Sequence, residues 1–259
     1  MRNEPIYVAF ATQKGGVGKS AFTVLAASYL QYVRGYNVAI VDCDFPQHSI
    51  HALRQREREK IAKDEYYRTM AMNHFAETDH ASYPIICSKA EDAFTSIKEQ
   101  LTRDNENYDI IFLDLPGTVN TVGVLNTLSQ VDHIFTPIIA DNLVLESSLS
   151  FASHLNENIV LNQSNRLKGI HLFWNLVDGR ERTDLYDTYE NGISSLGLDV
   201  LTTTIPDTKR FRKEMSADRR VPFRSTLLPP DRRSIKGSGV VELIDEICSI
   251  INLTPHNEG

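Results

Sequence analysis

Residues 13–20 read Gln-Lys-Gly-Gly-Val-Gly-Lys-Ser, and this stretch determines the fold that we expect for the chain. An apolar, strand-like run at residues 6–11 leads into it, and a helix-like run at residues 21–30 follows. A glycine-rich turn between a strand and a helix is the setting of a phosphate-binding loop. The stretch therefore predicts an anion site at the start of a helix, directly after the first strand.

The residue types in this loop suit a chain of phosphates. Gly15, Gly16 and Gly18 carry no Cβ atom, so the backbone can adopt unusual dihedral angles and approach an anion closely. Their N–H groups then line a concave nest at a helix N-terminus, where the helix dipole favours negative charge. In such loops the lysine, here Lys19, reaches the β- and γ-phosphates, and the hydroxyl group, here Ser20, binds Mg²⁺.

Strand-like and helix-like segments alternate along the rest of the chain. We expect strands at residues 6–11, 37–42, 83–87, 108–114, 134–139, 169–177 and 200–205. We expect helices at residues 19–34, 49–70, 90–102, 120–130, 143–161, 184–196 and 240–253, with a loop at residues 71–81. This alternation predicts a three-layer α/β fold with helices on both faces of a mainly parallel, twisted sheet. No linker or repeat divides the chain, so residues 1–259 are expected to form a single domain.

The composition is ordinary for a globular protein, with 41% apolar and 24% charged residues among 259. No run approaches the roughly 18 apolar residues that span a bilayer, and the N-terminus lacks the apolar segment of a signal peptide. We therefore expect a cytoplasmic protein. Cys43, Cys87 and Cys248 are odd in number and widely spaced, which favours three buried thiols over a zinc or redox motif.

The charge is distributed unevenly along the chain. The formal net charge is −7, which by itself argues against binding to nucleic acid. Residues 206–236, however, contain ten Lys and Arg against four acids, a local charge of +6, so the other residues together carry −13. Such asymmetry is typical of a localised anion-binding surface. A solvated surface whose cations pair with Glu214 and Asp218 is the alternative interpretation.

The loop at residues 13–20 resembles the deviant Walker A loop of the ParA/MinD family of P-loop ATPases. The general motif has glycine where this chain has Gln13, and here a second lysine, Lys14, precedes the glycine pair. In that family the extra lysine reaches across a nucleotide-sandwich dimer to the partner's ATP. The resemblance implies a P-loop NTPase fold, ATP and Mg²⁺ as cofactors, an ATP-dependent homodimer, and catalytic roles for Lys14 and Lys19. The loop residues expected to bind the nucleotide are Lys14, Gly15, Gly16, Val17, Gly18, Lys19, Ser20 and Ala21.

An aspartate ends the most strand-like segment of the chain, at residues 108–114. Asp114 is where a Walker B carboxylate that holds Mg²⁺ belongs. Gly117 completes a D-x-x-G pattern whose N–H group can sense a γ-phosphate, and it stands where many ParA relatives have proline. We therefore expect Asp114 in the metal site and Gly117 in the nucleotide site.

A pair of aspartates follows the strand at residues 37–42. The segment Asp-Cys-Asp-Phe-Pro-Gln at residues 42–47 resembles switch I of ParA proteins, with Phe45 as an additional residue. By this resemblance Asp44 orients or activates the attacking water, and Asp42 supports the Mg²⁺ shell. Ser20, Asp42 and Asp114 are thus the residues expected around the metal.

Later segments also resemble the family. Asn175 matches the asparagine that helps to bind adenine, and Pro206 with Asp207 matches the turn that lines the base pocket. The basic segment lies where ParA relatives contact DNA without sequence preference, through phosphate neutralisation. The residues expected to make these contacts are Lys209, Arg210, Arg212, Lys213, Arg219 and Arg220.

The last helix bears on membrane binding. MinD-type relatives end in a basic amphipathic helix that binds anionic lipid. Here the polar face carries Glu242, Asp245 and Glu246 and no lysine or arginine, so an anionic membrane would repel it. We expect its apolar face to pack on the domain instead.

The resemblance implies an ATP-dependent dimerisation switch that binds DNA nonspecifically and hydrolyses ATP slowly until a ParB-like or other partner stimulates it. Such proteins position plasmids, chromosomes or mobile elements. Two alternatives remain open at this point. An ATPase that positions a protein cargo would have no need of the basic block at residues 206–236. An electron-transfer ATPase similar to the nitrogenase iron protein would need two suitably placed cysteines at a dimer interface.

Overall fold

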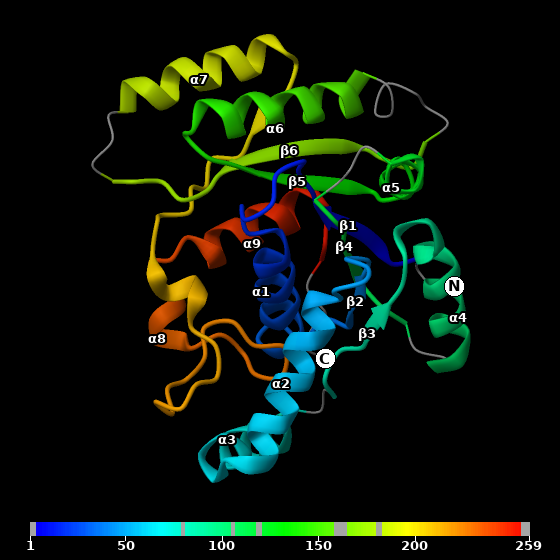
Figure 1. Cartoon of the computed structure of the whole chain (residues 1–259), viewed down its shortest axis with the longest axis vertical. Helices are drawn as coiled ribbons and strands as arrows, with labels where there is room; N and C mark the ends of the chain where they lie inside the picture. The colour runs from blue at the N-terminus through cyan, green and yellow to red at the C-terminus, as the bar shows by residue number, and fades with distance from the viewer. Residues whose placement is uncertain are drawn as a thin grey trace.

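The computed structural model contains a seven-stranded sheet in its described residues, and all of the strand pairs are parallel (Figure 1). The structure describes residues 4–78, 81–104, 107–117, 121–157, 165–179 and 183–254, apart from the side chains of residues 183–185 and of Arg212. The strand order is β3-β2-β4-β1-β5-β6-β7. The strands are β1 Ile6–Phe10, β2 Val38–Asp42, β3 Ile85–Cys87, β4 Ile110–Asp114, β5 His133–Ile138, β6 Gly169–Trp174 and β7 Asp199–Val200. The expected α/β fold with a parallel sheet is confirmed.

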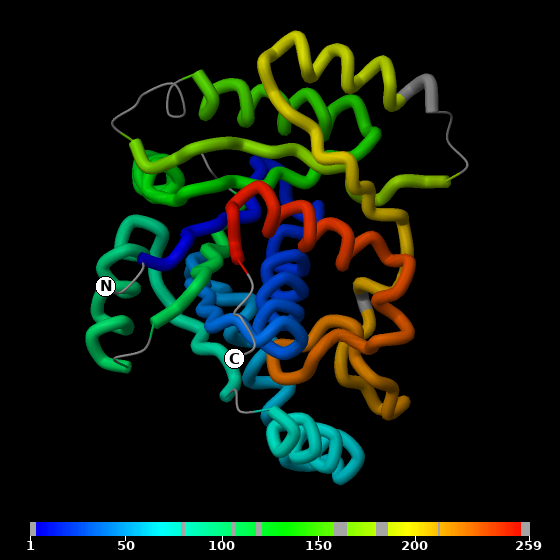
Figure 2. The backbone as a smooth tube through the Cα atoms, turned by 180° about the vertical axis from the view of Figure 1, so that it is seen from behind, coloured from blue at the N-terminus to red at the C-terminus, as the bar shows by residue number. Residues whose placement is uncertain are grey.

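Helices cover both faces of this sheet. One face packs against α1 (Lys19–Tyr32), α2 (Ser49–Lys63) and α9 (Val240–Ile250). The other packs against α4 (Ala93–Asp104), α5 (Val122–Leu128), α6 (Asn142–Leu155) and α7 (Thr183–Ser195). The remaining elements are α3 (Glu65–Glu77), α8 (Arg232–Ile235) and the short 3₁₀ helices η1 (Ala90–Asp92) and η3 (Lys209–Arg212). Figure 2 shows α9 beside α1 from behind, and the α2–α3 pair extends away from the sheet at the bottom of Figure 1.

The strands have the continuous apolar sequences that a sheet covered on both faces requires. In β1, Val8 and Phe10 belong to the core under α1, whereas Tyr7 and Ala9 belong to the core under α4–α7. The strand order reverses at β1, which lies between β4 and β5. In open parallel sheets such a reversal leaves a crevice at the carboxyl ends of the strands, where ligands bind. The loop at residues 13–20 follows β1 and therefore lies at this crevice.

Two local expectations are wrong. The loop expected at residues 71–81 is largely helical, because α3 runs to Glu77 and buries Tyr67 and Ala71. The strand expected at residues 200–205 is limited to β7. The N–H groups of Thr202 and Thr203 donate to the Glu246 carboxylate on α9, at 2.8 and 2.9 Å, instead of to a neighbouring strand. The end of the helix expected at residues 143–161 lies outside the described residues.

The last helix packs on the domain, as expected. Val240, Leu243, Ile244 and Ile247 are buried. On the acidic face, Glu246 accepts a hydrogen bond from the Thr202 N–H and Asp245 forms an ion pair with Arg34. Within the described part of the chain, no helix has the length and apolar character needed to cross a membrane.

The cysteines differ from the expectation at one position. Cys43 is buried and Cys248 is partly buried, but Cys87, at the end of the edge strand β3, is exposed. The residues of β3 are less buried than those of the central strands, since β3 has a neighbouring strand on one side only.

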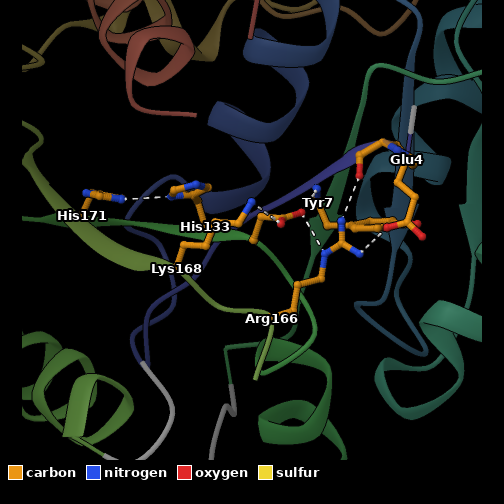
Figure 3. Close-up of polar contacts among 8 residues, drawn as sticks. Glu4, Tyr7, His133, Arg166, Lys168 and His171 are labelled. Atoms are coloured by element: carbon orange, nitrogen blue, oxygen red, sulfur yellow. Dashed lines mark hydrogen bonds and ion pairs between the residues drawn. The ribbon is translucent and has the colours of Figure 1, made fainter. Parts of the chain in front are cut away.

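A polar cluster lies at the amino ends of the interior strands β1, β5 and β6 (Figure 3). The buried carboxylate of Asp132 accepts hydrogen bonds from the Tyr7 N–H (2.9 Å) and the Arg166 Nε–H (3.1 Å), and it pairs with Lys168 Nζ at 3.0 Å. Arg166 also pairs with Glu4 and lies over the Tyr7 ring. These contacts join the start of β1 to the segment that precedes β6.

Two histidines lie beside this cluster. His133 Nδ1 is 3.2 Å from His171 Nε2, on the neighbouring strand (Figure 3). A Cβ atom at Gly169 would lie 2.8 Å from His171 Nε2, so the glycine makes room for the ring. Burial lowers the pKa of His133 to about 4, helped by His171 and Lys168 and opposed by Asp132. Burial also lowers the pKa of His171, and Asp199 opposes that shift.

This pair should make the fold sensitive to acid. Between pH 6.5 and about 4 the unfolded chain binds a proton on His133 that the folded protein does not, so acidification favours unfolding. In His133→Gln this contribution is absent. We expect the free energy of unfolding to fall by about 1–2 kcal/mol less between pH 7 and pH 5 than in the unchanged protein.

Urea unfolding at a series of pH values measures this difference. His154→Gln, at an exposed histidine on α6, is the matched control and should keep the slope of the unchanged protein. Identical slopes for His133→Gln and the unchanged protein would contradict the prediction.

Candidate functional site

The loop after β1 has the backbone conformation of a phosphate-binding nest. Gly16 and Gly18 have φ angles of 79° and 99°, in the region that favours glycine, and Gly18 is the N-cap of α1. A Cβ atom at Gly18 would lie 3.0 Å from the Phe22 ring and 3.3 Å from Asn175 Nδ2, so a larger residue does not fit. The N-terminus of α1 thus opens onto this loop with its N–H groups available to an anion.

The two lysines of the loop differ in their surroundings. Lys19 is buried, and its ammonium group donates to the Lys14 carbonyl oxygen at 3.1 Å. Burial lowers the pKa of Lys19, and the carboxylates of Asp114 and Asp44 oppose that shift. The side chain of Lys14 is exposed. Lys19 therefore belongs to the interior of the site, and Lys14 is directed to solvent, where a second molecule can approach it.

Asp114 and Ser20 are joined directly. The Ser20 hydroxyl donates to Asp114 Oδ2 at 2.7 Å, while Asp114 Oδ1 is buried and has no hydrogen-bond partner within the described part of the chain. Burial raises the pKa of Asp114 to about 7, Asp42 adds to the shift, and the Ser20 hydrogen bond and Lys19 oppose it. A buried carboxylate oxygen without a donor is costly unless a cation or proton satisfies it.

These groups fit a hard divalent cation. Mg²⁺ binds through one or two carboxylates or hydroxyl groups together with phosphate oxygens and waters. Ser20 Oγ and the unpartnered oxygen of Asp114 are ligands of that kind at the foot of the phosphate loop. The site can therefore hold Mg²⁺ together with a nucleotide.

Asp42 and Asp44 have different roles in the structure. The fully buried Asp42 carboxylate accepts from the N–H groups of Ile50 (3.0 Å) and His51 (2.9 Å), in the first turn of α2, and from the Asp44 N–H (3.3 Å). It thus holds the start of α2 and the loop before it. Asp44 is partly exposed and lines the cavity above the phosphate loop. A contact of Asp42 with the metal shell remains a prediction.

A cavity of about 370 Å³ opens above the loop. Its lining comes from four segments that are distant in sequence and contains most of the residues expected around phosphates and metal. The lining residues are Gly15, Gly16, Gly18, Lys19, Ser20, Ala21, Asp44, Leu115, Gly117 and Arg224. Gly117 is close to Lys19, since a Cβ atom on it would lie 3.5 Å from Lys19 Nζ. Arg224 was not expected, because in the sequence it is one of ten cations in the basic segment.

The three residues expected around adenine lie close together but outside the lining of this cavity. Asn175 is buried, and its amide donates to the Val17 carbonyl oxygen at 2.9 Å, so it supports the phosphate loop from the end of β6. Pro206 pairs with Val177, and the Asp207 N–H donates to the Val177 carbonyl oxygen at 2.9 Å. The structure thus brings the Asn175 and Pro206 segments side by side, and their contact with adenine stays a prediction.

The basic segment is only partly available to a ligand. Lys209, Lys213 and Arg220 are exposed. The exposed Arg219 pairs with Asp64, at 3.2 Å from Nε. Arg210 donates through Nη1 to the carbonyl oxygens of Ser234 and Lys236, both at 3.1 Å. The side chain of Arg212 lies outside the described residues.

Taken together, the fold and the loop define a P-loop nucleotide-binding protein with a deviant lysine before the glycine pair. Residues 8–221 match the family model described as the CobQ/CobB/MinD/ParA nucleotide binding domain. The chain therefore belongs to this family.

Individual relatives support the same assignment. The chromosome-partitioning ATPase Soj of Thermus thermophilus is 30% identical over 217 residues, which cover 81% of this chain and 84% of Soj. A putative plasmid partition protein of Borrelia burgdorferi, solved with AMPPNP, is 18% identical with a TM-score of 0.58, covering 94% of this chain and 98% of that one. A chain of the Aquifex aeolicus MinC:MinD complex is 15% identical with a TM-score of 0.58 and 99% coverage of both chains. The two solved structures show likeness of fold.

The geometry predicts different consequences for the two switch aspartates. Asp42→Ala removes the acceptor of two helical N–H groups, so we expect the nucleotide-free protein to lose about 2–3 kcal/mol of unfolding free energy. Asp44→Ala alters a partly exposed side chain and should change that free energy by less than about 0.5 kcal/mol. Urea denaturation without nucleotide or Mg²⁺ measures both, and equal losses for the two variants would contradict the assignment.

Proposed function

We propose that this protein is a ParA-type ATPase that dimerises on binding ATP and Mg²⁺, binds DNA nonspecifically as a dimer and hydrolyses ATP to ADP and phosphate. Its role is then the partition or positioning of plasmid, chromosomal or mobile-element DNA. The observation that carries the proposal is the cavity in which the nest of residues 15–18 meets Lys19, Ser20 and Asp44. The likeness to the partition ATPase Soj supports the cellular role.

The proposed chemistry follows from positioning and charge. Lys19 and the loop N–H groups neutralise the phosphates, and Ser20 with Asp114 holds Mg²⁺, which supplies charge stabilisation at the phosphates. Asp44 is a partly exposed carboxylate that lines the cavity. A carboxylate there can orient a water for in-line attack and accept its proton. In this proposal Gly117, which lies beside Lys19, donates its N–H to the terminal phosphate.

Lys14 is the residue that links hydrolysis to dimerisation in this proposal. Its side chain is exposed at the mouth of the site, while its carbonyl oxygen accepts from Lys19. An exposed cation beside a phosphate loop can complete the site of a second molecule across a two-fold axis. Stimulation by a ParB-like or other partner protein belongs to the same proposal.

DNA binding rests on the exposed part of the basic segment. Lys209, Lys213, Arg219 and Arg220 are exposed within a stretch of net charge +6, on a chain that is otherwise acidic. Phosphate neutralisation requires only clustered cations, and typical nonspecific affinities are roughly 10⁻⁴–10⁻⁶ M. A dimer doubles the number of such contacts, so binding that depends on ATP follows from dimerisation.

The test of the switch is Lys14→Ala. We expect this variant to bind ATP with Mg²⁺ within about threefold of the unchanged protein, since Lys14 points to solvent, but to lose the ATP-dependent dimer. Light scattering in ADP and in ATP measures the mass, with Asp44→Ala as a matched variant that should dimerise and fail to hydrolyse. A stable ATP dimer of Lys14→Ala would exclude the cross-subunit role.

The test of DNA binding is Lys213→Glu combined with Arg220→Glu. We expect the affinity for nonspecific duplex DNA in ATP to fall at least about tenfold, with a shallower salt dependence and unchanged nucleotide affinity. Lys98→Glu, at an exposed position on α4, is the control and should bind DNA normally. Unchanged DNA affinity of the double variant would instead favour an ATPase that positions a protein cargo.

A further inference from the structure

Arg224 lies at the phosphate cavity although it is 200 residues away from the phosphate loop in sequence. It is the half-exposed member of an otherwise buried run, with Phe223 before it and Ser225 and Thr226 after it. It lines the cavity of about 370 Å³ together with Lys19, and also an adjoining hollow of about 130 Å³. Ser20 is the other residue common to both linings. Arg224 is therefore on the side of the cavity that Ser20 occupies.

The backbone around Arg224 is fixed on both sides. The N–H groups of Phe223 and Arg224 donate to the Lys213 carbonyl oxygen, at 2.9 and 3.1 Å. The Ser225 carbonyl oxygen accepts from Ser28 on α1 at 2.6 Å, and the Thr226 N–H donates to Glu57 on α2 at 2.9 Å. These contacts to two helices leave the direction of the Arg224 side chain little freedom.

The guanidinium is held on one edge and incompletely satisfied on another. One Nη of Arg224 donates to Glu214 Oε1, whereas its Nε–H is buried and has no hydrogen-bond partner among the residues that the structure describes. The second carboxylate oxygen of Glu214 is 3.8 Å from Arg56 on α2. A guanidinium has five N–H donors in a planar fork, so it can keep one carboxylate and still bind a second anion. The Nη–H groups that Glu214 does not use are the donors that a phosphate oxygen in the cavity lined by Arg224 can accept from.

We propose that Arg224 is a third phosphate-binding cation of the nucleotide site, alongside Lys19 and the loop N–H groups, and that Glu214 is its positioning residue. This inference rests on the proposed nucleotide-dependent function. The ligand chemistry is the oxyanion of a nucleoside di- or triphosphate with Mg²⁺. A guanidinium binds such oxygens through charge-assisted hydrogen bonds, and the partly closed cavity screens them less than bulk water does.

The alternative is that Arg224 only neutralises Glu214. The two possibilities differ when Glu214 is changed. If Arg224 binds phosphate, its removal weakens nucleotide binding even in a Glu214→Gln background. If it serves Glu214 alone, the removal has no further effect in that background, because the partner is already absent.

The experiment measures the affinity of the full-length protein for the β,γ-imido analogue of ATP with Mg²⁺ by titration calorimetry. We expect Arg224→Gln to raise the Kd about ten- to hundredfold, both alone and in the Glu214→Gln background. Arg224→Lys, which keeps the charge but not the fork, should fall between. Arg58→Gln, the same change at an exposed arginine on α2, should stay within about twofold.

Several outcomes overturn the inference. A Kd within twofold of the unchanged protein for Arg224→Gln would do so, as would a loss that disappears in the Glu214→Gln background. Circular dichroism tests whether the variants are folded. If Arg224→Gln is unfolded, the comparison of Arg224→Lys with the unchanged protein still tests the inference.

Lys19→Gln distinguishes a failure of the proposed function from a failure of the inference about Arg224. If the unchanged protein fails to bind the analogue, the proposed function fails and the inference with it. If only Lys19→Gln loses binding, the inference alone fails.

Discussion

Two buried carboxylates in register on neighbouring strands constrain the whole site. Asp42 ends β2, Asp114 ends β4, and the parallel pairing places them opposite each other. Neither is accessible to solvent, and burial, with a smaller contribution from the charge of Asp42, raises the pKa of Asp114. Such a pair is tolerated only when separate donors satisfy each member. The surrounding segments are arranged to supply those donors.

The two sets of donors come from different parts of the chain. Asp42 receives the first N–H groups of α2, which lets the loop of residues 43–48 leave the sheet and places Asp44 at the cavity. Asp114 receives the hydroxyl of Ser20 and the charge of Lys19, which ties the end of β4 to the first turn of α1. The Asp42 carboxylate thereby holds the start of α2, while Asp114 keeps one oxygen that no described residue hydrogen-bonds. Equivalent positions in the sheet thus take different chemical roles because their neighbours differ.

The sequence was informative where function depends on neighbours in the chain. The glycines, Lys19 and Ser20 are held by one turn, so their spacing alone predicts their arrangement around an anion. The strands and most helices could likewise be predicted from the periodicity of apolar residues, because that pattern also depends on neighbours in the chain. The use of Asp42 as an acceptor for α2 required knowledge of how that helix packs. Arg224 was hidden among nine other cations, because only the contacts of residues 223–226 with α1 and α2 direct it to the cavity.

Errors at the secondary-structure level have a similar origin. The strand-like sequence of residues 200–205 forms only a short strand. The N–H groups of Thr202 and Thr203 donate to the Glu246 carboxylate on α9 instead of to β6, and β7 therefore ends early. Residues 71–77 were expected to be a loop, but they continue the helix α3, which Tyr67 anchors from its first turn. The Tyr67 hydroxyl is 3.0 Å from the carbonyl oxygens of Ser216 and Arg220 and accepts from the Ser216 N–H at 3.0 Å. A single tyrosine thus stabilises both the helix and a loop some 150 residues away.

That loop connects the two surfaces on which the proposed function depends. Lys213 accepts two backbone hydrogen bonds from Phe223 and Arg224 through its carbonyl oxygen, while its own side chain is exposed. Residues 213–224 therefore form a closed segment with cations on both sides, Lys213 and Arg220 towards solvent and Arg224 towards the phosphate cavity. The closure is made by the backbone hydrogen bonds to Lys213, and Tyr67 holds the carbonyl oxygens of Ser216 and Arg220 within the segment. The basic segment thus contributes Arg224 to the wall of the phosphate cavity, while Lys213 and Arg220 lie on the solvent side of the same loop.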